Sequence, residues 1–414
     1  MKGFLFPILT LFAATVLLGC SQDDSADGGM AYSDKPVYFL AATNDASATR
    51  GSVIAAGDLP TSLSFRVYAT QQRRQGDTPV DDDITEFINP GASSTDNVVT
   101  YQQVNVHAGT TYAPYYVGVW KTNVEYLWPQ DTRFVNFYAV HPAEAPAISN
   151  ILASKSIDYD GSTEALSLKG QYDLMYAAVR TRRDDGTFTQ QLDLLPDNRA
   201  VALEFHHLLS RISFYGRLSE ELASYGWKVQ IQDISICNVN VAGTLTFADN
   251  PAEGAALIPA ATPVHQSIAM VMNNADEGAH LTLSTTAVEE DAQGNKVPLT
   301  SPTDIAMLMP QTLAAWDYAT ETSGTTTPVT PGGYLAIKMR IVDGEGHYHL
   351  GTASSYETMF SPFPINWSAS NNYAYTLSFG LGLNAAGVSK KQPIGITCAI
   401  TPWESRSIEG KAVH

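Results

Sequence analysis

Short segments in which apolar and polar residues alternate recur along almost the whole chain, and they constrain the fold more than any other feature. Residues 63–69, Leu-Ser-Phe-Arg-Val-Tyr-Ala, are one example. Alternation with a period of two places the apolar side chains on one face of a β-strand. Residues rich in Gly, Ser, Thr and Pro separate these segments. Many short strands joined by turns predict an all-β chain built from β-sandwiches rather than an α/β fold.

We expect strands on both sides of a join near residues 195–199. In the second half, residues 219–225 are the one place where a short helix competes with a strand. Two acidic segments, residues 81–83 and 158–161, are predicted to be loops. The second begins like a calcium-binding loop but has no Glu at its twelfth position, so we expect a solvated loop without calcium. The expected strands are 36–42, 63–69, 98–106, 115–120, 133–142, 172–179, 228–247 as a pair, 267–272, 280–288, 305–309, 333–342, 372–379 and 394–400.

Length and charge limit the classes of protein to which the chain can belong. Its 414 residues have room for two ordinary domains, each with its own core. The net charge is -18, with only 24 Lys and Arg residues, so phosphate backbones and anionic lipid headgroups would repel it. Nucleic acid is therefore not an expected partner.

The N-terminal residues predict export. Lys2 precedes an uncharged apolar run, Phe4–Leu18, which is too short for a resident membrane span. The end of this run and the next two residues, Leu17-Leu-Gly-Cys20, resemble the lipobox of bacterial lipoproteins, in which the cysteine is acylated when the signal peptide is cut. This implies a signal peptide over residues 1–20 and lipidation of Cys20. The acidic run after Cys20 resembles a surface-export signal of some Gram-negative anaerobes, and a solvated linker explains it equally well.

We find no glycine loop for phosphate, no Gly-x-Ser-x-Gly elbow and no Cys-x-x-Cys pair, which argues against an enzyme. Adjacent His206 and His207 would point to opposite faces of a strand and cannot easily share a metal. His347 and His349 share a face, but no third ligand is evident, so no metal site is predicted. The six tryptophans are able to stack on sugar rings or to fill sandwich cores. Whether Cys237 pairs with Cys398 is left open.

Several separate segments, in a fixed order along the chain, share one resemblance. They are Trp128-Pro129 before residues 134–142, Phe205-His-His-Leu-Leu-Ser-Arg-Ile-Ser213, residues 231–247, Met309-Pro-Gln-Thr312, Asn372-Tyr-Ala-Tyr-Thr-Leu377 and Thr401-Pro-Trp-Glu404. Together these segments resemble one family, the fimbrillins, which are lipoprotein pilins that build type V pili. The resemblance implies two tandem β-sandwich domains of transthyretin- or immunoglobulin-like fold, here over residues 51–198 and 199–404, with no catalysis and no cofactor.

In that family a trypsin-like protease removes an N-terminal segment at the cell surface. The resemblance places this cut after Arg50, in Ala48-Thr-Arg-Gly51, with Arg73 and Arg183 as rival sites. Residues 21–50 would then be a tether and a removable strand segment. Its central residues are Val37, Tyr38, Phe39 and Leu40. Loss of this strand would leave an apolar groove for a strand from another subunit.

The resulting hypothesis is a structural subunit of a type V pilus on the outer membrane, anchored by its acyl group and contributing to cell adhesion. Its partners would be other pilin subunits and a host glycan or protein receptor. Residues 405–414 form a short tail with few apolar residues, which makes it a poor donor strand, so stalk, tip and accessory roles all remain open. The alternative hypothesis is a surface lipoprotein that binds host or dietary glycan and does not polymerise.

Overall fold

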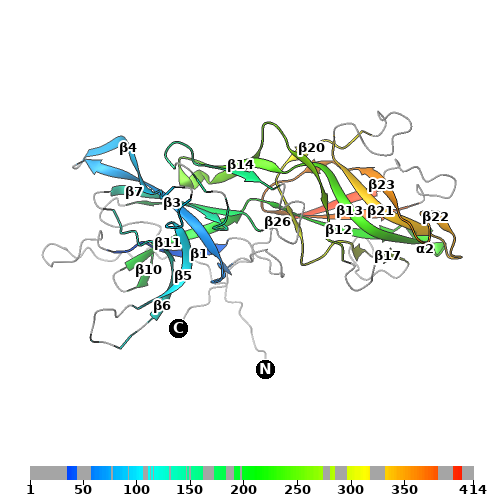
Figure 1. Cartoon of the computed structure of the whole chain (residues 1–414), viewed down its shortest axis with the longest axis horizontal. Helices are drawn as coiled ribbons and strands as arrows, with labels where there is room; N and C mark the ends of the chain where they lie inside the picture. The colour runs from blue at the N-terminus through cyan, green and yellow to red at the C-terminus, as the bar shows by residue number, and fades with distance from the viewer. Residues whose placement is uncertain are drawn as a thin grey trace, which may run out of the picture.

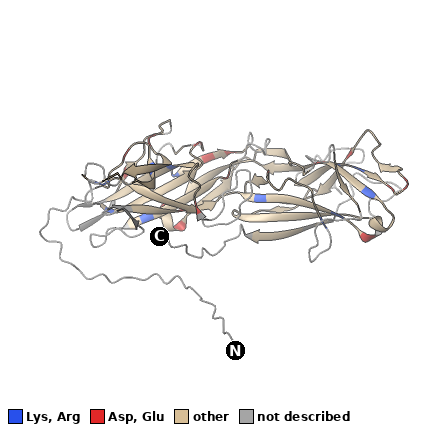
Figure 2. Cartoon of the chain, turned by 90° about the horizontal axis from the view of Figure 1, so that it is seen from below, with Lys and Arg blue, Asp and Glu red and all other residues tan. Residues whose placement is uncertain are grey.

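The computed structural model has an all-β fold, as predicted, and Figure 1 shows its strands in two groups along the long axis of the molecule. Within the described residues no helix is long and apolar enough to cross a membrane. Charged residues are sparse over both groups (Figure 2). The structure describes residues 35–43, 57–75, 78–91, 93–105, 111, 113–114, 116–129, 132–145, 147–148, 151–161, 172–182, 191–195, 198–273, 280–284, 296–317, 332–380 and 395–402.

The first group is a ten-stranded sheet in the described part of the chain, and its strands follow the order β10-β11-β9-β7-β3-β5-β6-β1-β2, with β4 paired to β3. Its strands are β1 (Tyr38–Thr43), β2 (Gly57–Asp58), β3 (Ser64–Gln75), β4 (Thr78–Ile88), β5 (Val98–Asn105), β6 (Tyr116–Thr122), β7 (Thr132–His141), β9 (Met175–Arg182), β10 (Gln191–Leu195) and β11 (Asn198–His207).

The second group contains two larger sheets and a two-stranded one. The strands of the first are β12 (Ser210–Leu218), β18 (Val297–Pro298), β19 (Ala306–Leu308), β25 (Asn371–Phe379) and β26 (Gly395–Pro402). Those of the second are β13 (Lys228–Asn240), β16 (His265–Ala269), β17 (Leu281–Leu283), β21 (Tyr334–Val342), β22 (Tyr348–Leu350) and β23 (Glu357–Pro362). The third pairs β20 (Thr312–Leu313) with β24 (Ile365–Asn366), and a helix, α2 (Glu220–Ser224), precedes β13.

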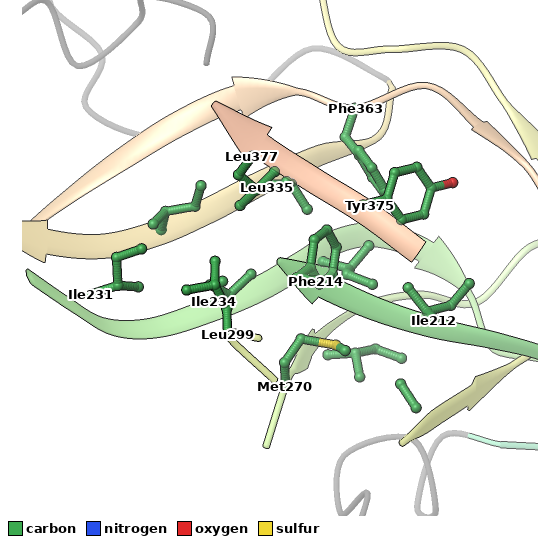
Figure 3. Packing of buried hydrophobic residues seen from close by; sticks show 14 of the residues in the cluster. Ile212, Phe214, Ile231, Ile234, Met270, Leu299, Leu335, Phe363, Tyr375 and Leu377 are labelled. Atoms are coloured by element: carbon green, nitrogen blue, oxygen red, sulfur yellow. The ribbon is translucent and has the colours of Figure 1, made fainter. Parts of the chain in front are cut away.

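The core of the second group lies between its two larger sheets. Figure 3 shows Phe214 of β12 and Tyr375 of β25 on one side, with Ile234 of β13 and Leu335 of β21 on the other. Phe214 and Tyr375 stack with ring centroids 5.5 Å apart. The alternating apolar residues of these four strands therefore supply the opposite walls of one buried layer.

A three-stranded sheet joins the two groups. It contains β8 (Ser156–Asp160), β14 (Ala242–Phe247) and β15 (Ala255–Pro259), in the order β15-β14-β8. The strand β8 comes from the first half of the sequence, and its ladder with β14 runs from Ser156↔Thr246 to Asp160↔Ala242. A core cluster at this place contains Tyr138 from the first half together with Leu209 and Phe247 from the second. The strand β11 extends the first sheet beyond residue 198, and the chain passes to the next sheet between His207 and Ser210.

Two segments predicted to be loops are strands. Residues 81–83 belong to β4, whose ladder with β3 pairs the residues on both sides of them, Pro79 with Arg74 and Ile84 with Gln72, with a register shift between. Residues 158–160 belong to β8, in which Ile157 and Tyr159 are buried while Asp158 and Asp160 are exposed. The aspartates alternate with the buried residues, so the segment does have the period of two of a strand. The two charged residues led to the prediction of a loop.

Candidate functional site

The most distinctive feature of the first sheet is the position of β1, its N-terminal strand. It pairs in parallel with β11 over six registers, from Tyr38↔Ala200 to Thr43↔Phe205. Its other edge pairs with β6 at Phe39↔Trp120 and with β2 at Ala42↔Asp58. The strand thereby closes the path β11-β9-β7-β3-β5-β6 into a ring. Removing β1 would leave both β11 and β6 with an unpaired edge.

The side chains of β1 fill the core of this ring. Val37 and Phe39 are 2% and 0% exposed. The Phe39 ring meets Phe65 edge-on with centroids 6.4 Å apart, and it meets Phe137 at 5.7 Å. Tyr38 is buried on the opposite face of the strand beside Val119 and Ala200, and half-buried Leu40 packs there too. Burial of Val37, Tyr38 and Phe39 contributes about 1.5–3 kcal/mol each.

Of the predicted site residues, the structure brings Val37, Tyr38, Phe39 and Leu40 together in this one segment. Cys20 and Arg50 lie outside the described residues. In the sequence, Arg50 is midway between Thr43, the last residue of β1, and Gly57, the first of β2. Since Thr43 and Gly57 are paired, a cut after Arg50 separates β1 from β2 while every described pairing of β1 is still in place.

A buried polar cluster lies where the chain leaves the first sheet. His207, the last residue of β11, contacts Asp173 with its Nδ1 2.8 Å from Oδ1, and their side chains are 1% and 0% exposed. His206 and His207 point to opposite faces of the strand, as predicted. His206 is half-buried and packs on Tyr176, whereas His207 faces Asp173. The backbone carbonyl of His207 also accepts a hydrogen bond from the Ser370 hydroxyl at 2.8 Å. These contacts tie the linker between the sheets to both groups of strands.

His141, at the end of β7, is the other buried histidine of this region. Its Nδ1 lies 2.8 Å from the Ser64 carbonyl oxygen. Burial lowers its pKa from the ordinary 6.5, against the opposing effects of this hydrogen bond and of nearby Asp173 and Glu144, while nearby His207 adds to the lowering. The folded protein therefore favours neutral His141.

This pKa shift predicts how stability depends on pH. The unfolded chain binds a proton at position 141 more tightly than the folded protein does, so the free energy of unfolding should fall as the pH drops through about 6.5. His141→Gln should flatten this part of the curve. Urea unfolding across this pH range provides the measurement, with His265→Gln, a change at an exposed histidine, as the control. An unchanged slope in His141→Gln would contradict the assignment.

The pair His347 and His349 lies beside an acidic residue. Asp343 accepts a hydrogen bond from the backbone N–H of His347 at 2.9 Å, and its Oδ2 lies 2.9 Å from Nε2 of His349. The His349 ring also stacks on Trp227, with centroids 4.3 Å apart. No group of His, Cys, Asp and Glu in the described residues has the arrangement of a metal site. The cluster fixes the turn between β21 and β22.

Nothing in the sequence indicated the role of Gln311, whose side-chain amide makes the hydrogen bonds that the backbone of a neighbouring strand would make. The Gln311 amide accepts a hydrogen bond from the Asn240 N–H at 2.9 Å and donates one to the Asn240 carbonyl at 3.0 Å. Nearby, a Cβ on Gly243 would lie 2.6 Å from the Ile258 carbonyl oxygen and 2.7 Å from the Met309 sulfur. The segments 309–312 and 231–247 therefore meet in space, with Gln311 beside the last residue of β13 and Met309 against Gly243 of β14.

The burial of the cysteines and tryptophans bears on whether the cysteines pair and whether the tryptophans are open to a sugar ring. Cys237 is buried and Cys398 is exposed, and both are free thiols. Burial raises the pKa of the Cys237 thiol, and partial desolvation beside its neighbours raises that of Cys398. Trp227 is half-buried. The tryptophans that are buried, and so closed to a sugar ring, are Trp120, Trp128, Trp316 and Trp367.

The last described strand, β26, is at the edge of its sheet and pairs only with β25 in the described part of the chain. Ile400 on this strand is 59% exposed. An exposed edge strand with apolar side chains is suited to contact with another chain.

Comparison with known proteins identifies the family. The model of the fimbrillin-like family matches residues 74–403. Among solved structures, a fimbrial protein from Bacteroides vulgatus is similar, with 12% identity, a TM-score of 0.43, and coverage of 89% of this chain and 100% of that one. The tip fimbrial protein Mfa3 from Porphyromonas gingivalis, with a C-terminal truncation, has 10% identity, a TM-score of 0.30, and the same two coverages. A comparison with curated protein sequences finds no match. The extent of the family match shows that this chain belongs to the fimbrillin-like family.

Proposed function

We propose that this protein is a surface-exposed pilus subunit of stalk, tip or accessory type, made of two tandem β-sandwich domains, which joins its neighbours by strand exchange after proteolytic maturation. Membership of the fimbrillin-like family supports the general role in a fimbrium and in cell adhesion. The observation that carries the assembly step is the position of β1, which closes the ring of paired strands and fills its core.

Maturation would act on the connection that contains Arg50. Connections between strands are accessible to proteases far more often than paired strands are. After a cut at Arg50, β1 keeps no covalent link to the ring, and only the ladders with β11, β6 and β2 and the burial of its side chains retain it. A donor strand able to make the same ladders would compete for the same groove.

The groove left by β1 offers a large driving force for this exchange. Three large side chains at about 1.5–3 kcal/mol each give about 5–9 kcal/mol before the cost of ordering the incoming strand. The unpaired edges of β6 and β11 add backbone hydrogen bonds for a strand that enters in register. Before the cut β1 occupies the groove, so early joining is blocked.

Anchoring completes the proposal. Acylation of Cys20 would hold the subunit at the outer membrane, with more than one acyl chain required for a stable attachment. The functional partners would be other pilin subunits and a host receptor. The protein would act as a building and adhesion component rather than as an enzyme.

The cleavage step predicts a specific result for Arg50→Ala. Brief trypsin treatment should cut the full chain after Arg50, whereas Arg50→Ala should stay uncut there because alanine offers no cationic side chain to the protease pocket. Mass spectrometry of the N-terminus and size-exclusion chromatography provide the measurements. Of these two proteins, only the trimmed parent should form larger species.

The controls are Arg73→Ala and Arg183→Ala, which remove the rival sites and should be trimmed like the parent. Arg73 lies in β3, opposite Thr132, where a paired backbone is a poor substrate. If Arg50→Ala is trimmed and assembles as the parent does, either a rival arginine is the site or the chain joins its neighbours by another route.

A further inference from the structure

A small cavity lies in the joint between the two groups of strands. Its volume is about 10 Å³, which is room for one water molecule. Its polar lining comes from both halves of the sequence, because Tyr159 belongs to β8, Asn240 ends β13 and Gln311 precedes β20. Apolar residues of the joint cluster and of the second core form most of the remaining wall. A molecule bound here would contact both sides of the joint.

The Asn240 side chain places an unused hydrogen-bond donor at this cavity. Asn240 is 6% exposed. Its Oδ1 accepts hydrogen bonds from the backbone N–H groups of Val264 at 2.9 Å and of Ala242 at 3.2 Å. A flipped amide would turn its own N–H groups against these two donors, so the amide orientation is fixed. The buried Nδ2 makes no hydrogen bond to a described residue, and a buried donor without an acceptor is costly.

Gln311 and Tyr159 present oxygen atoms to the same cavity. The Gln311 Nε2 donates to the carbonyl oxygens of Asn240 and Met309, at 3.0 and 3.2 Å. Its Oε1 accepts one hydrogen bond, from the Asn240 N–H, and an amide oxygen can accept two. The Tyr159 hydroxyl lies beside Gly161, where a Cβ would be only 2.8 Å from it, and Gly161 also lines the cavity.

The size and the charge of the cavity restrict what can bind in it. The unused N–H of Asn240 needs an acceptor, which a metal cation cannot supply. None of the described residues that line the cavity carries a formal charge, so an anion would lose its hydration without gaining a counter-charge. A water molecule is small enough, is uncharged, and both accepts and donates hydrogen bonds.

We propose that this cavity holds a structural water molecule, which accepts a hydrogen bond from Asn240 Nδ2 and donates to Gln311 Oε1 and to the Tyr159 hydroxyl oxygen. About three hydrogen bonds are typical of a buried water. The water thereby links β8, from the first half of the sequence, to the end of β13 and the segment before β20 in the second half. This inference is separate from the proposed pilus function and does not depend on cleavage at Arg50.

High-resolution crystallography of the full chain tests the position of the water. A density peak should lie about 2.7–3.2 Å from both Asn240 Nδ2 and Gln311 Oε1. The proposal fails if crystals that show other buried waters have no peak at this place. It also fails if a protein acceptor lies within hydrogen-bonding distance of Asn240 Nδ2, because the donor then needs no water.

Magnetic relaxation dispersion of water oxygen-17 tests the site in solution, because it counts the water molecules that stay bound for longer than nanoseconds. Asn240→Leu places an apolar group of similar size at the site and should lower the count by one. The matched control is Asn123→Leu, at an exposed asparagine of the first half, which should keep the count of the parent.

Tyr159→Phe keeps the test decisive if Asn240→Leu does not fold, since it removes only the hydroxyl. Loss of one hydrogen bond should shorten the residence time of this water about five-fold. Tyr225→Phe, at an exposed tyrosine, is the control and should leave the residence time unchanged. Residence times in Tyr159→Phe equal to those of the parent, or a count in folded Asn240→Leu equal to that of the parent, would overturn the proposal.

Discussion

Replacing Phe39 with alanine is expected to lower the free energy of unfolding by about 3–5 kcal/mol. The phenyl group of Phe39 is fully buried and packs edge-on against Phe65 and Phe137. Truncation to alanine removes this buried apolar surface and leaves a cavity that the two neighbours cannot fill. The effect should be this large because β1 closes the ring of strands, so weaker packing of β1 also weakens its pairing with β11 on one edge and with β6 on the other. Urea unfolding followed by tryptophan fluorescence provides the measurement.

Leu40→Ala is the matched control for this experiment. It changes the next residue of the same strand, which is half-buried on the opposite face, and should cost less than about 2 kcal/mol. The Phe39→Ala variant should also lose its N-terminal segment to proteases more quickly than Leu40→Ala. Equal stability of the Phe39→Ala protein and the parent would show that β1 does not support the core of the ring.

Asp173→Ala is expected to destabilise the protein by about 3–5 kcal/mol, because it removes the buried carboxylate that contacts His207 and leaves a cavity beside the imidazole ring. The contact is 2.8 Å long, and both side chains are almost completely buried. Asp173→Asn keeps an acceptor oxygen at the same place and should cost less. Thermal or urea unfolding of both variants at neutral pH distinguishes the loss of a hydrogen-bond acceptor from the loss of a charge.

A double-mutant cycle with His207→Ala tests whether the two residues act as one unit. If they do, the double variant should lose much less than the sum of the two single losses. Additive losses would mean that each residue is held by other neighbours. Since His207 begins the linker between the sheets, the variants should also show whether the two groups of strands still unfold together.

The sequence was sufficient to predict the all-β fold and most of the longer strands, because their alternating residues match the burial seen in the structure. The pair of strands predicted around residues 241–243 is seen as β13 and β14, and the segment 36–42 is seen as β1. In these segments buried apolar residues recur at alternate positions over most of their length, which is a local signal, although Tyr38 of β1 is buried on the opposite face and the register of β13 shifts between Ile231 and Asp233. At residues 219–225, where the sequence leaves a short helix in competition with a strand, the structure has the helix α2.

The interactions that sequence could not predict are those set by distant partners. The hydrogen bonds between Gln311 and Asn240 join residues far apart in the chain, and a glutamine in a loop gives no sign that it will replace a strand. Likewise, the pairing of Ala42 with Glu204 on one side and with Asp58 on the other depends on the register of three separate strands. A one-residue shift in either ladder would have moved a carboxylate to the other face.

The pairing of β8 with β14 has a mechanical consequence. Five registers of antiparallel ladder, a shared apolar cluster and the linker at residues 208–209 connect the two groups of strands, so relative rotation of the groups would have to break several hydrogen bonds at once. A hinge held by a single linker would bend freely, whereas this connection is stiff. If such subunits form a filament, as proposed above, the middle of each subunit is therefore not a place where the filament bends easily.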